Sequence, residues 1–233
     1  MAMLPLVLVC NRWEEDVSWL GRQPFPAVVY ERKPPRNMGR HAVPFNLGNE
    51  AAAYLKFIVD YYDVLPERML FLHSHRLAYH QEDLLILLHR LRPEEADYCN
   101  INSMAWGDKE NIVLGDESYI ETQWHWLEKW LGPRPALLLH RCCAQFLVHR
   151  DRVRRHPVEF YLEGLARMSL SVDKEESRRW GLLFEWLWHY IFGEPAVSEE
   201  LAHLLPLLKE VDRVKLGDRA ACMGNSPDGT GTL

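Results

Sequence analysis

The sequence predicts an α/β protein: a single domain with a mainly parallel, mixed central sheet flanked by helices. Two continuous apolar runs, residues 4–10 and 69–72, have the length and composition of strands buried on both faces. Between them, residues 46–62 carry apolar side chains at helical spacing. A helix that joins two strands in this order forms a right-handed crossover, which makes the strands parallel.

The first 45 residues are expected to form a strand, the start of a helix and a second strand. The run at 4–10 has no basic region before it and is shorter than the ~20 apolar residues that cross a bilayer. We therefore interpret it as the first strand and not as a signal or an anchor. Residues 14–20 pass from polar to apolar and favour a helix start capped by Asp16 or Ser18. A short strand at 27–30 and a proline-rich loop at 32–44 follow.

Helices alternate with short strands after residue 72. Gly132-Pro133 and Gly193 are stop signals that end two of the helices. Helices are expected at 82–91, 119–131, 150–168, 175–192 and 198–211, and short strands near 98–102 and at 136–141 and 144–148. The rest of 93–117 is expected to be irregular. The polar, glycine-rich end predicts a disordered tail at 216–233 behind one catalytic-like α/β domain at 1–215.

Composition excludes several classes of protein. The chain has 27 basic and 33 acidic residues and a formal net charge of −6. This balance argues against a nucleic-acid binder whose affinity comes from neutralising phosphates. The five cysteines are odd in number and contain no C-x-x-C pair, so neither a disulfide framework nor a zinc ribbon is indicated. Reduced thiols and no transmembrane segment predict a cytoplasmic protein.

A histidine cluster follows the strand at 69–72. His73 and His75 are one residue apart and are followed by Arg76 and His80. Ligands bind beyond the carboxyl ends of strands in open α/β sheets, where two imidazoles would hold a metal when neutral or a phosphate when protonated. The alternative is that these histidines are only polar residues that end a strand.

A carboxylate and another imidazole lie on the apolar helix expected at 175–192. Glu185 and His189 are four residues apart and share a face of that helix. Glu185 is a candidate general base and His189 a third imidazole for a metal. The alternative is a structural Glu–His pair, since buried polar groups need partners.

Polar residues of three further segments are candidates for donor binding. Acidic residues after a first parallel strand contact the ribose or base of nucleotides in other α/β proteins, and a turn that opens a helix can hold a phosphate. These segments contribute Asn11, Arg12, Glu15, Asp16, Asn46, Gly48 and Gln145. A solvated helix start and a plain helix N-terminus are the alternatives for the first two segments. Cys143, beside Gln145, is interpreted as a small buried hydrophobe and not as a nucleophile.

Five ordered blocks resemble a family known as a domain of unknown function. The blocks are E-D-x-x-W-L, N-x-G-x-E, an L-P segment leading to F-x-H-x-H-R-x-x-x-H, C-C-A-Q-F-x-V and W-H-x-I-F-G, here at 15–20, 46–50, 65–80, 142–148 and 188–193. The resemblance covers residues 5 to 197. Two positions depart from the family pattern: Asn49 stands where arginine is usual, and Tyr79 where tryptophan is usual.

That family is in turn similar to nucleotide-sugar glycosyltransferases of the A-type fold. The resemblance implies transfer of a sugar from a nucleotide-diphosphate donor to a glycan or small hydroxylated acceptor. His73-Ser74-His75 stands where those enzymes carry the Asp-x-Asp that binds metal and diphosphate. It implies Mn²⁺ or Zn²⁺ held by His73, His75 and His189, or a metal-free diphosphate site of protonated imidazoles with Arg76. Glu185, His189 and His80 are the implied catalytic residues.

Two other functions remain open from the sequence. One is a metal-dependent hydrolase that uses the histidine cluster, and the other is a carbohydrate-binding domain without catalysis. A tightly held metal would favour the hydrolase, whereas ligand binding that survives loss of both His73 and His75 would favour the binding domain.

Overall fold

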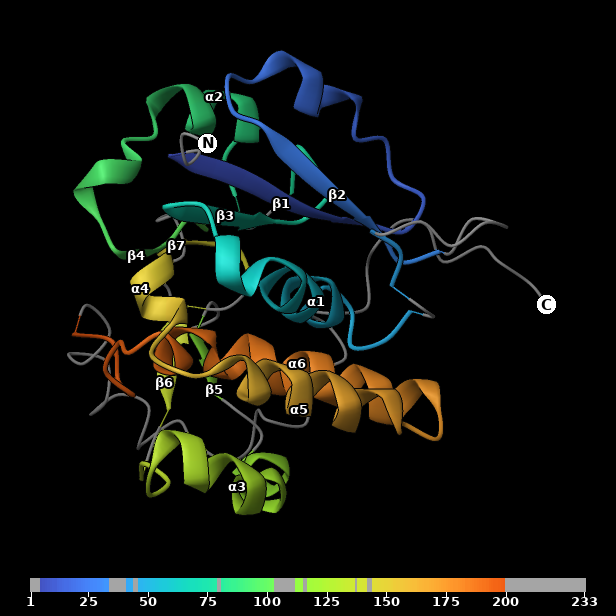
Figure 1. The fold of residues 1–233 in the computed structure, drawn as a ribbon, viewed down its shortest axis with the longest axis vertical. Coiled ribbons are helices and arrows are strands. Elements are labelled where there is room, and N and C mark those ends of the chain that lie inside the picture. Colours follow the sequence, from blue (N-terminus) through green and yellow to red (C-terminus); the bar gives the residue numbers. More distant parts are fainter. Residues whose placement is uncertain are drawn as a thin grey trace. The chain divides into compact units, whose positions relative to one another are not determined.

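Five strands form one open sheet at the centre of the fold (Figure 1). Their order is β2-β1-β3-β7-β4. The strands are β1 (Leu6–Arg12), β2 (Ala27–Glu31), β3 (Arg68–Leu72), β4 (Tyr98–Asn100) and β7 (Phe146–His149). This computed structural model describes residues 5–33, 41–43, 46–78, 81–102, 112–114, 117–136, 138–141 and 144–199.

Strand β1 is buried on both faces, as its uninterrupted apolar sequence predicts. Side chains alternate between the two faces of a strand. Leu6, Leu8 and Cys10 belong to one hydrophobic cluster, and Val7 and Val9 belong to another. Strand β3 divides in the same way between the two clusters. The sheet therefore needs cover on both faces.

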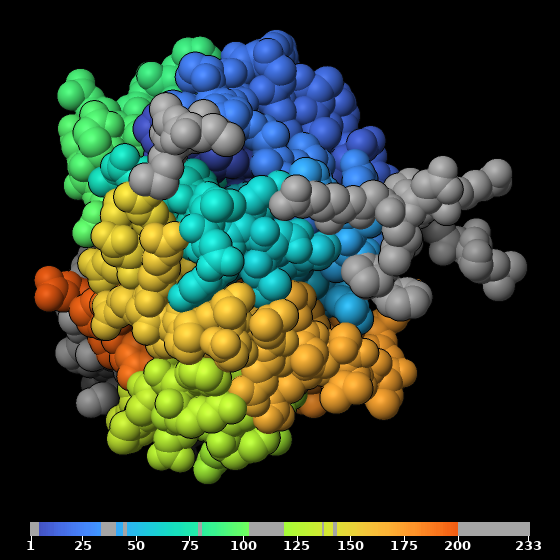
Figure 2. All heavy atoms as spheres, in the orientation of Figure 1, coloured from blue at the N-terminus to red at the C-terminus, as the bar shows by residue number. Residues whose placement is uncertain are grey.

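Helices of different sequence regions cover the two faces. The face of Val7 and Val9 packs against α1 (Ala51–Tyr61), with α5 (Val158–Ser169) and α6 (Lys174–Ile191) beyond it. The face of Leu6 and Leu8 packs against α2 (Leu84–Arg90) and the short 3₁₀ helix η1 (Ser18–Arg22). In Figure 2 the atoms of α1 and α5 form one continuous surface, although a hundred residues separate them in the chain.

A second, two-stranded sheet pairs β5 (Ile112–Leu114) with β6 (Leu139–Arg141). The aromatic helix α3 (Glu117–Leu131) packs against α5 and α6, because Trp126 lies 6.1 Å from Phe160 and 6.0 Å from Trp180 between ring centroids. The remaining elements are η2 (Tyr62–Val64), η3 (Pro93–Glu95) and α4 (Arg150–Val153).

The predicted α/β class is confirmed, and the sheet is mixed. β1 pairs in parallel with β2 and β3, as the crossover argument requires. β7 pairs antiparallel with both β3 and β4. Four strands therefore share one direction, and β7 runs against them. The reversed strand returns the chain to the sheet from the region of α3 and β6.

Several predicted boundaries were wrong. The helix expected at 150–168 is broken into α4 and α5, because Pro157 lacks an amide hydrogen and disfavours helical geometry in the preceding residue. The helix start expected at 14–20 is a turn followed by η1, in which Asp16 accepts a 2.8 Å hydrogen bond from the amide of Ser18. The irregular stretch at 93–117 contains β5.

Several predictions fall outside the described residues. These are the last helix at 198–211 beyond residue 199, the tail at 216–233, His80, and Cys142-Cys143. In the part of the chain that the structure describes, no helix is both long and apolar enough to cross a lipid bilayer.

Candidate functional site

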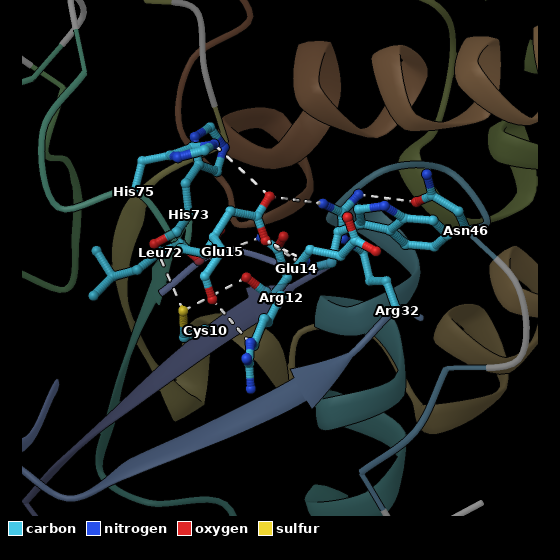
Figure 3. A network of polar contacts seen from close by, with 12 residues as sticks. Cys10, Arg12, Glu14, Glu15, Arg32, Asn46, Leu72, His73 and His75 are labelled. Carbon is cyan, nitrogen blue, oxygen red and sulfur yellow. Dashed lines mark hydrogen bonds and ion pairs between the residues drawn. The ribbon is translucent and has the colours of Figure 1, made fainter. Parts of the chain in front are cut away.

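The order of the strands places the carboxyl ends of β1 and β3 side by side, and this edge of the sheet is the candidate site. The chain passes from β1 to its neighbour β2 on one side and then crosses to β3 on the other side. In open α/β sheets a crevice forms at this reversal, beyond the carboxyl ends of the strands. Cys10 of β1 is level with Leu72 of β3, so residues 13–16 and 73–76 leave the sheet side by side (Figure 3).

Buried side chains hold the backbone of residues 73–76 from three sides. Gln145 accepts a 3.0 Å hydrogen bond from the amide of His73, and Gln81 donates to the carbonyls of His75 (2.9 Å) and Arg76 (3.0 Å). The indole of Trp19 donates to the carbonyl of Ser74 at 2.8 Å. This segment is thus ordered before any ligand arrives, and the two histidine rings extend from a fixed backbone.

Glu15 lies between His75 and the cation Arg32. Its Oε1 lies 3.8 Å from Nε2 of His75 and 3.8 Å from Nη2 of Arg32 (Figure 3). Its Oε2 accepts hydrogen bonds from the amides of Trp13 (2.6 Å) and Glu14 (3.1 Å). Partial burial raises the pKa of Glu15, but the Trp13 amide and Arg32 outweigh it and the net pKa is lowered. Glu15 is therefore ionised at neutral pH.

Arg32 is a site residue that the sequence analysis did not single out. It follows β2, its side chain is 12% exposed, and its Nη1 donates to Oδ1 of Asn46 at 2.9 Å. Its Nε is buried and has no hydrogen-bond partner in the described structure. An arginine held this far from solvent presents a fixed positive charge at the edge of the sheet.

A cleft of about 450 Å³ opens beside these charges, at the ends of β1 and β2. Its lining residues are Arg12, Trp13, Glu14, Glu31 and Lys33. Arg12 pairs with Glu31 at 3.1 Å and donates to the carbonyl of Glu15 at 2.9 Å, so cleft and edge share one framework. The Lys33 ammonium lies 6.0 Å from the centre of the Trp13 ring. The cleft thus combines an aromatic face with charges of both signs.

Two carboxyl groups of distant segments influence each other, and Arg32 acts on one of them. Glu50 immediately precedes α1 and Glu185 lies on α6. Burial, reinforced by the charge of Glu185, raises the pKa of Glu50 to about 7, while Arg32 acts in the opposite direction. Glu185 and Arg32 therefore both act on the Glu50 carboxyl, with opposite effects on its pKa. Glu50 was not predicted as a partner of Glu185, because nothing in the sequence connects residues 135 positions apart.

Some predicted donor-binding residues have structural contacts here. Asn11 is buried and donates to the carbonyl of Leu72 at 3.3 Å, and Gln145 is fully buried in an amide network with Gln81 and Asn102. Arg76 forms a two-pronged pair with Asp83, the N-cap of α2. Gly48 donates its amide to the hydroxyl of Ser177 at 2.9 Å. Asn11, Gln145 and Arg76 thus stabilise the edge, whereas Gly48 joins the turn before α1 to α6.

His189 lies apart from the other two predicted metal ligands. Its ring stacks on His140 of β6 at 4.3 Å between centroids, and its Nε2 lies 3.3 Å from the carbonyl oxygen of Ala196. Within the described residues, no three histidine, cysteine, aspartate or glutamate side chains are gathered as a metal site. His73, His75 and His189 thus do not fit a shared metal ion.

The chain matches one family over most of its length. The match covers residues 7–204, and the description of that family is "Protein of unknown function (DUF3431)". No curated protein and no solved structure gives a significant match.

Proposed function

The chain belongs to this family of unknown function, DUF3431, and we propose from its site that it is a glycosyltransferase that uses a nucleotide-diphosphate sugar. One observation carries the proposal: the aromatic, charged cleft and the edge with Arg32 and His75 adjoin where the strand order reverses, and Arg32 also acts on Glu50 of the Glu50–Glu185 carboxyl pair. Each of the three suits a different part of such a reaction.

The cleft suits the nucleoside. The Trp13 indole offers a flat apolar surface on which a base can stack. Glu31 is the last residue of β2, the position from which a carboxylate accepts hydrogen bonds from ribose hydroxyls in dinucleotide-binding sheets. A volume of about 450 Å³ lies in the range of small-ligand sites.

The edge suits the diphosphate. Arg32 supplies a permanent positive charge, and His73 and His75 add imidazoles that become cationic on protonation. The Glu15 carboxylate lies 3.8 Å from Nε2 of His75 and so fixes a negative charge beside that ring. Arg32 and the two imidazoles would stabilise the negative charge that develops on the leaving diphosphate, without a protein-bound metal.

Glu185 suits the role of general base. Its carboxylate would accept the proton of the acceptor hydroxyl while the acceptor oxygen bonds to the anomeric carbon of the sugar. The bond from that carbon to the diphosphate oxygen breaks, and the nucleoside diphosphate leaves with the electron pair. No further reactant is needed.

Nucleotide binding tests the proposal. Isothermal titration of the full chain with uridine and guanosine diphosphate, with and without Mn²⁺, should give a one-site isotherm for at least one nucleotide. Trp13→Ala and Arg32→Gln should each weaken that binding about tenfold, since each removes a contact worth roughly 1–2 kcal/mol. Trp130→Ala on α3, which alters an indole partner of Phe160, is the matched control and should bind as the wild type does.

Absence of binding to every nucleoside diphosphate, under both metal conditions, would remove the proposal. Binding that is retained when His73 and His75 are both replaced by alanine would favour the non-catalytic carbohydrate-binding domain.

A further inference from the structure

Glu50 is a partly exposed carboxyl to which the proposed reaction assigns no role. Resting on the proposed function, we propose that Glu50 and Glu185 act as one unit, in which a proton held by Glu50 controls the Glu185 carboxylate that deprotonates the acceptor. Glu50 is thus a positioning residue that acts through Glu185.

The packing of α6 against the turn before α1 places the two carboxyl groups on adjoining segments. Ser177, Gly181 and Glu185 are spaced by four residues and lie on one face of α6. The Ser177 hydroxyl accepts from the amide of Gly48 at 2.9 Å and donates to the carbonyl of Asn46 at 3.4 Å. One helical turn later, a Cβ on Gly181 would lie only 2.6 Å from the carbonyl oxygen of Gly48. Glu185 follows after one more turn on the same face of α6, and its charge acts on Glu50, two residues beyond Gly48.

The turn itself is held in an uncommon conformation. Gly48 and Asn49 both have positive φ, 55° and 52°. A non-glycine residue in this region is uncommon and is maintained by its surroundings. Here the surroundings are Ser177 and Gly181, so the same contact that fixes the turn also sets the approach of Glu50 to α6.

The charged and titratable groups around Glu50 come from three elements. Glu185 faces it from α6, Arg32 from the end of β2, and the Tyr54 phenol from one turn farther along α1. Glu185 and burial favour the protonated form of Glu50, whereas Arg32 opposes it. Near neutral pH Glu50 therefore gains and loses a proton, and its charge changes the electrostatic field at Glu185.

This arrangement makes proton transfer sensitive to pH near neutrality. When Glu50 loses its proton, a second negative charge appears beside Glu185 and strengthens it as a base. Transfer activity should therefore rise as the pH passes through about 7, the pKa of Glu50. A neutral glutamine at position 50 retains the size of the side chain but removes this titration.

Carbon NMR of the full chain, labelled at the glutamate carboxyl carbons, tests the pair independently of activity. The wild type should show one carboxyl that titrates near pH 7. Glu50→Gln should remove that titration, and Glu185→Gln should move it toward the ordinary range of glutamate. Glu121→Gln, an exposed glutamate of α3, should leave it unchanged.

The transfer assay then separates the two proposals. Glu185→Gln should lower kcat by ~100-fold or more, as expected for loss of a general base. Glu50→Gln should retain KM and flatten the pH profile of kcat between pH 6 and 8. The proposed coupling is wrong if Glu50 has an ordinary glutamate pKa, or if Glu185→Gln leaves the pKa of Glu50 unchanged. If Glu50 titrates near pH 7 but the protein turns over no nucleotide sugar, the coupling of Glu50 to Glu185 stands and the glycosyltransferase proposal is wrong.

Discussion

Buried side-chain amides determine the geometry of the candidate site. Gln145 is fully buried and bonds to three groups: the His73 amide, Asn102 at 3.0 Å, and the carboxamide of Gln81. Gln81 in turn holds the carbonyls of His75 and Arg76. The motif C-C-A-Q-F is thus explained by its glutamine, which ties β7 to the histidine segment. Gln145 therefore supports the backbone of the histidine segment.

Gln145→Ala should destabilise the fold and loosen this edge. It leaves up to three buried polar groups unsatisfied at about 1 kcal/mol each, so the free energy of unfolding should fall by about 2–3 kcal/mol in urea titrations. Nucleotide affinity should fall with it, because His73 and His75 lose their fixed backbone.

Gln123→Ala on α3 provides the comparison for that measurement and should change stability by less than about 0.5 kcal/mol. Equal stability of the Gln145 and Gln123 variants would show that the amide network contributes nothing to the fold.

Among the helices, the packing of α6 against the start of α1 depends on glycines, which have no Cβ atom. Gly181 permits the backbone contact with Gly48, and Gly164 of α5 lets the ring of Phe184 approach, since a Cβ there would lie 2.8 Å from its Cζ atom. Small residues at both positions let α1, α5 and α6 pack closely over one face of the sheet. The spacing of the helices, and with it the position of Glu185, follows from these two glycines.

Gly181→Ala should therefore displace α6. The added methyl group meets a backbone carbonyl that cannot rotate away, so we expect a loss of about 1–3 kcal/mol in the free energy of unfolding. The raised pKa of Glu50 should also fall, because Glu185 moves away from it.

Gly21→Ala is the matched change for this test. A Cβ at that position meets no atom within 4 Å, so its stability should equal or slightly exceed that of the wild type. If Gly181→Ala and Gly21→Ala have the same free energy of unfolding, close packing at Gly181 does not limit the position of α6.

For the molecule as a whole, buried titratable groups make stability depend on pH in two opposing ways. Burial lowers the pKa of His140 to about 3, helped by His189, and lowers that of His189 to about 4. Both histidines are neutral in the folded protein, whereas the unfolded chain binds their protons at about 6.5. Stability contributed by this stack is thus present above pH 6.5 and is lost as the pH falls. Glu50 has the opposite sign, because its raised pKa favours the folded state at lower pH.

The free energy of unfolding should fall between pH 7.5 and 5 by about 2 kcal/mol for each of the two stacked histidines. Denaturant titrations in a Glu50→Gln background isolate this contribution from that of Glu50. His189→Gln should remove about half of the decrease, while His125→Gln, an exposed histidine of α3, should leave it intact. A decrease that persists in full in the His189 variant would assign it to other groups.

The α/β class, the buried strands β1 and β3, the helix between them and the histidines that follow β3 could be predicted from the amino-acid sequence. These are local properties: an apolar run or a helical spacing is visible within a dozen residues. Four features are evident only in the folded molecule: the reversed direction of β7, the support of the backbone by Gln145 and Asn11, the stacking of His189 on His140, and the effect of Glu185 on the pKa of Glu50. Each of these depends on which segments, far apart in the chain, pack against one another, and close packing rather than local spacing sets that choice.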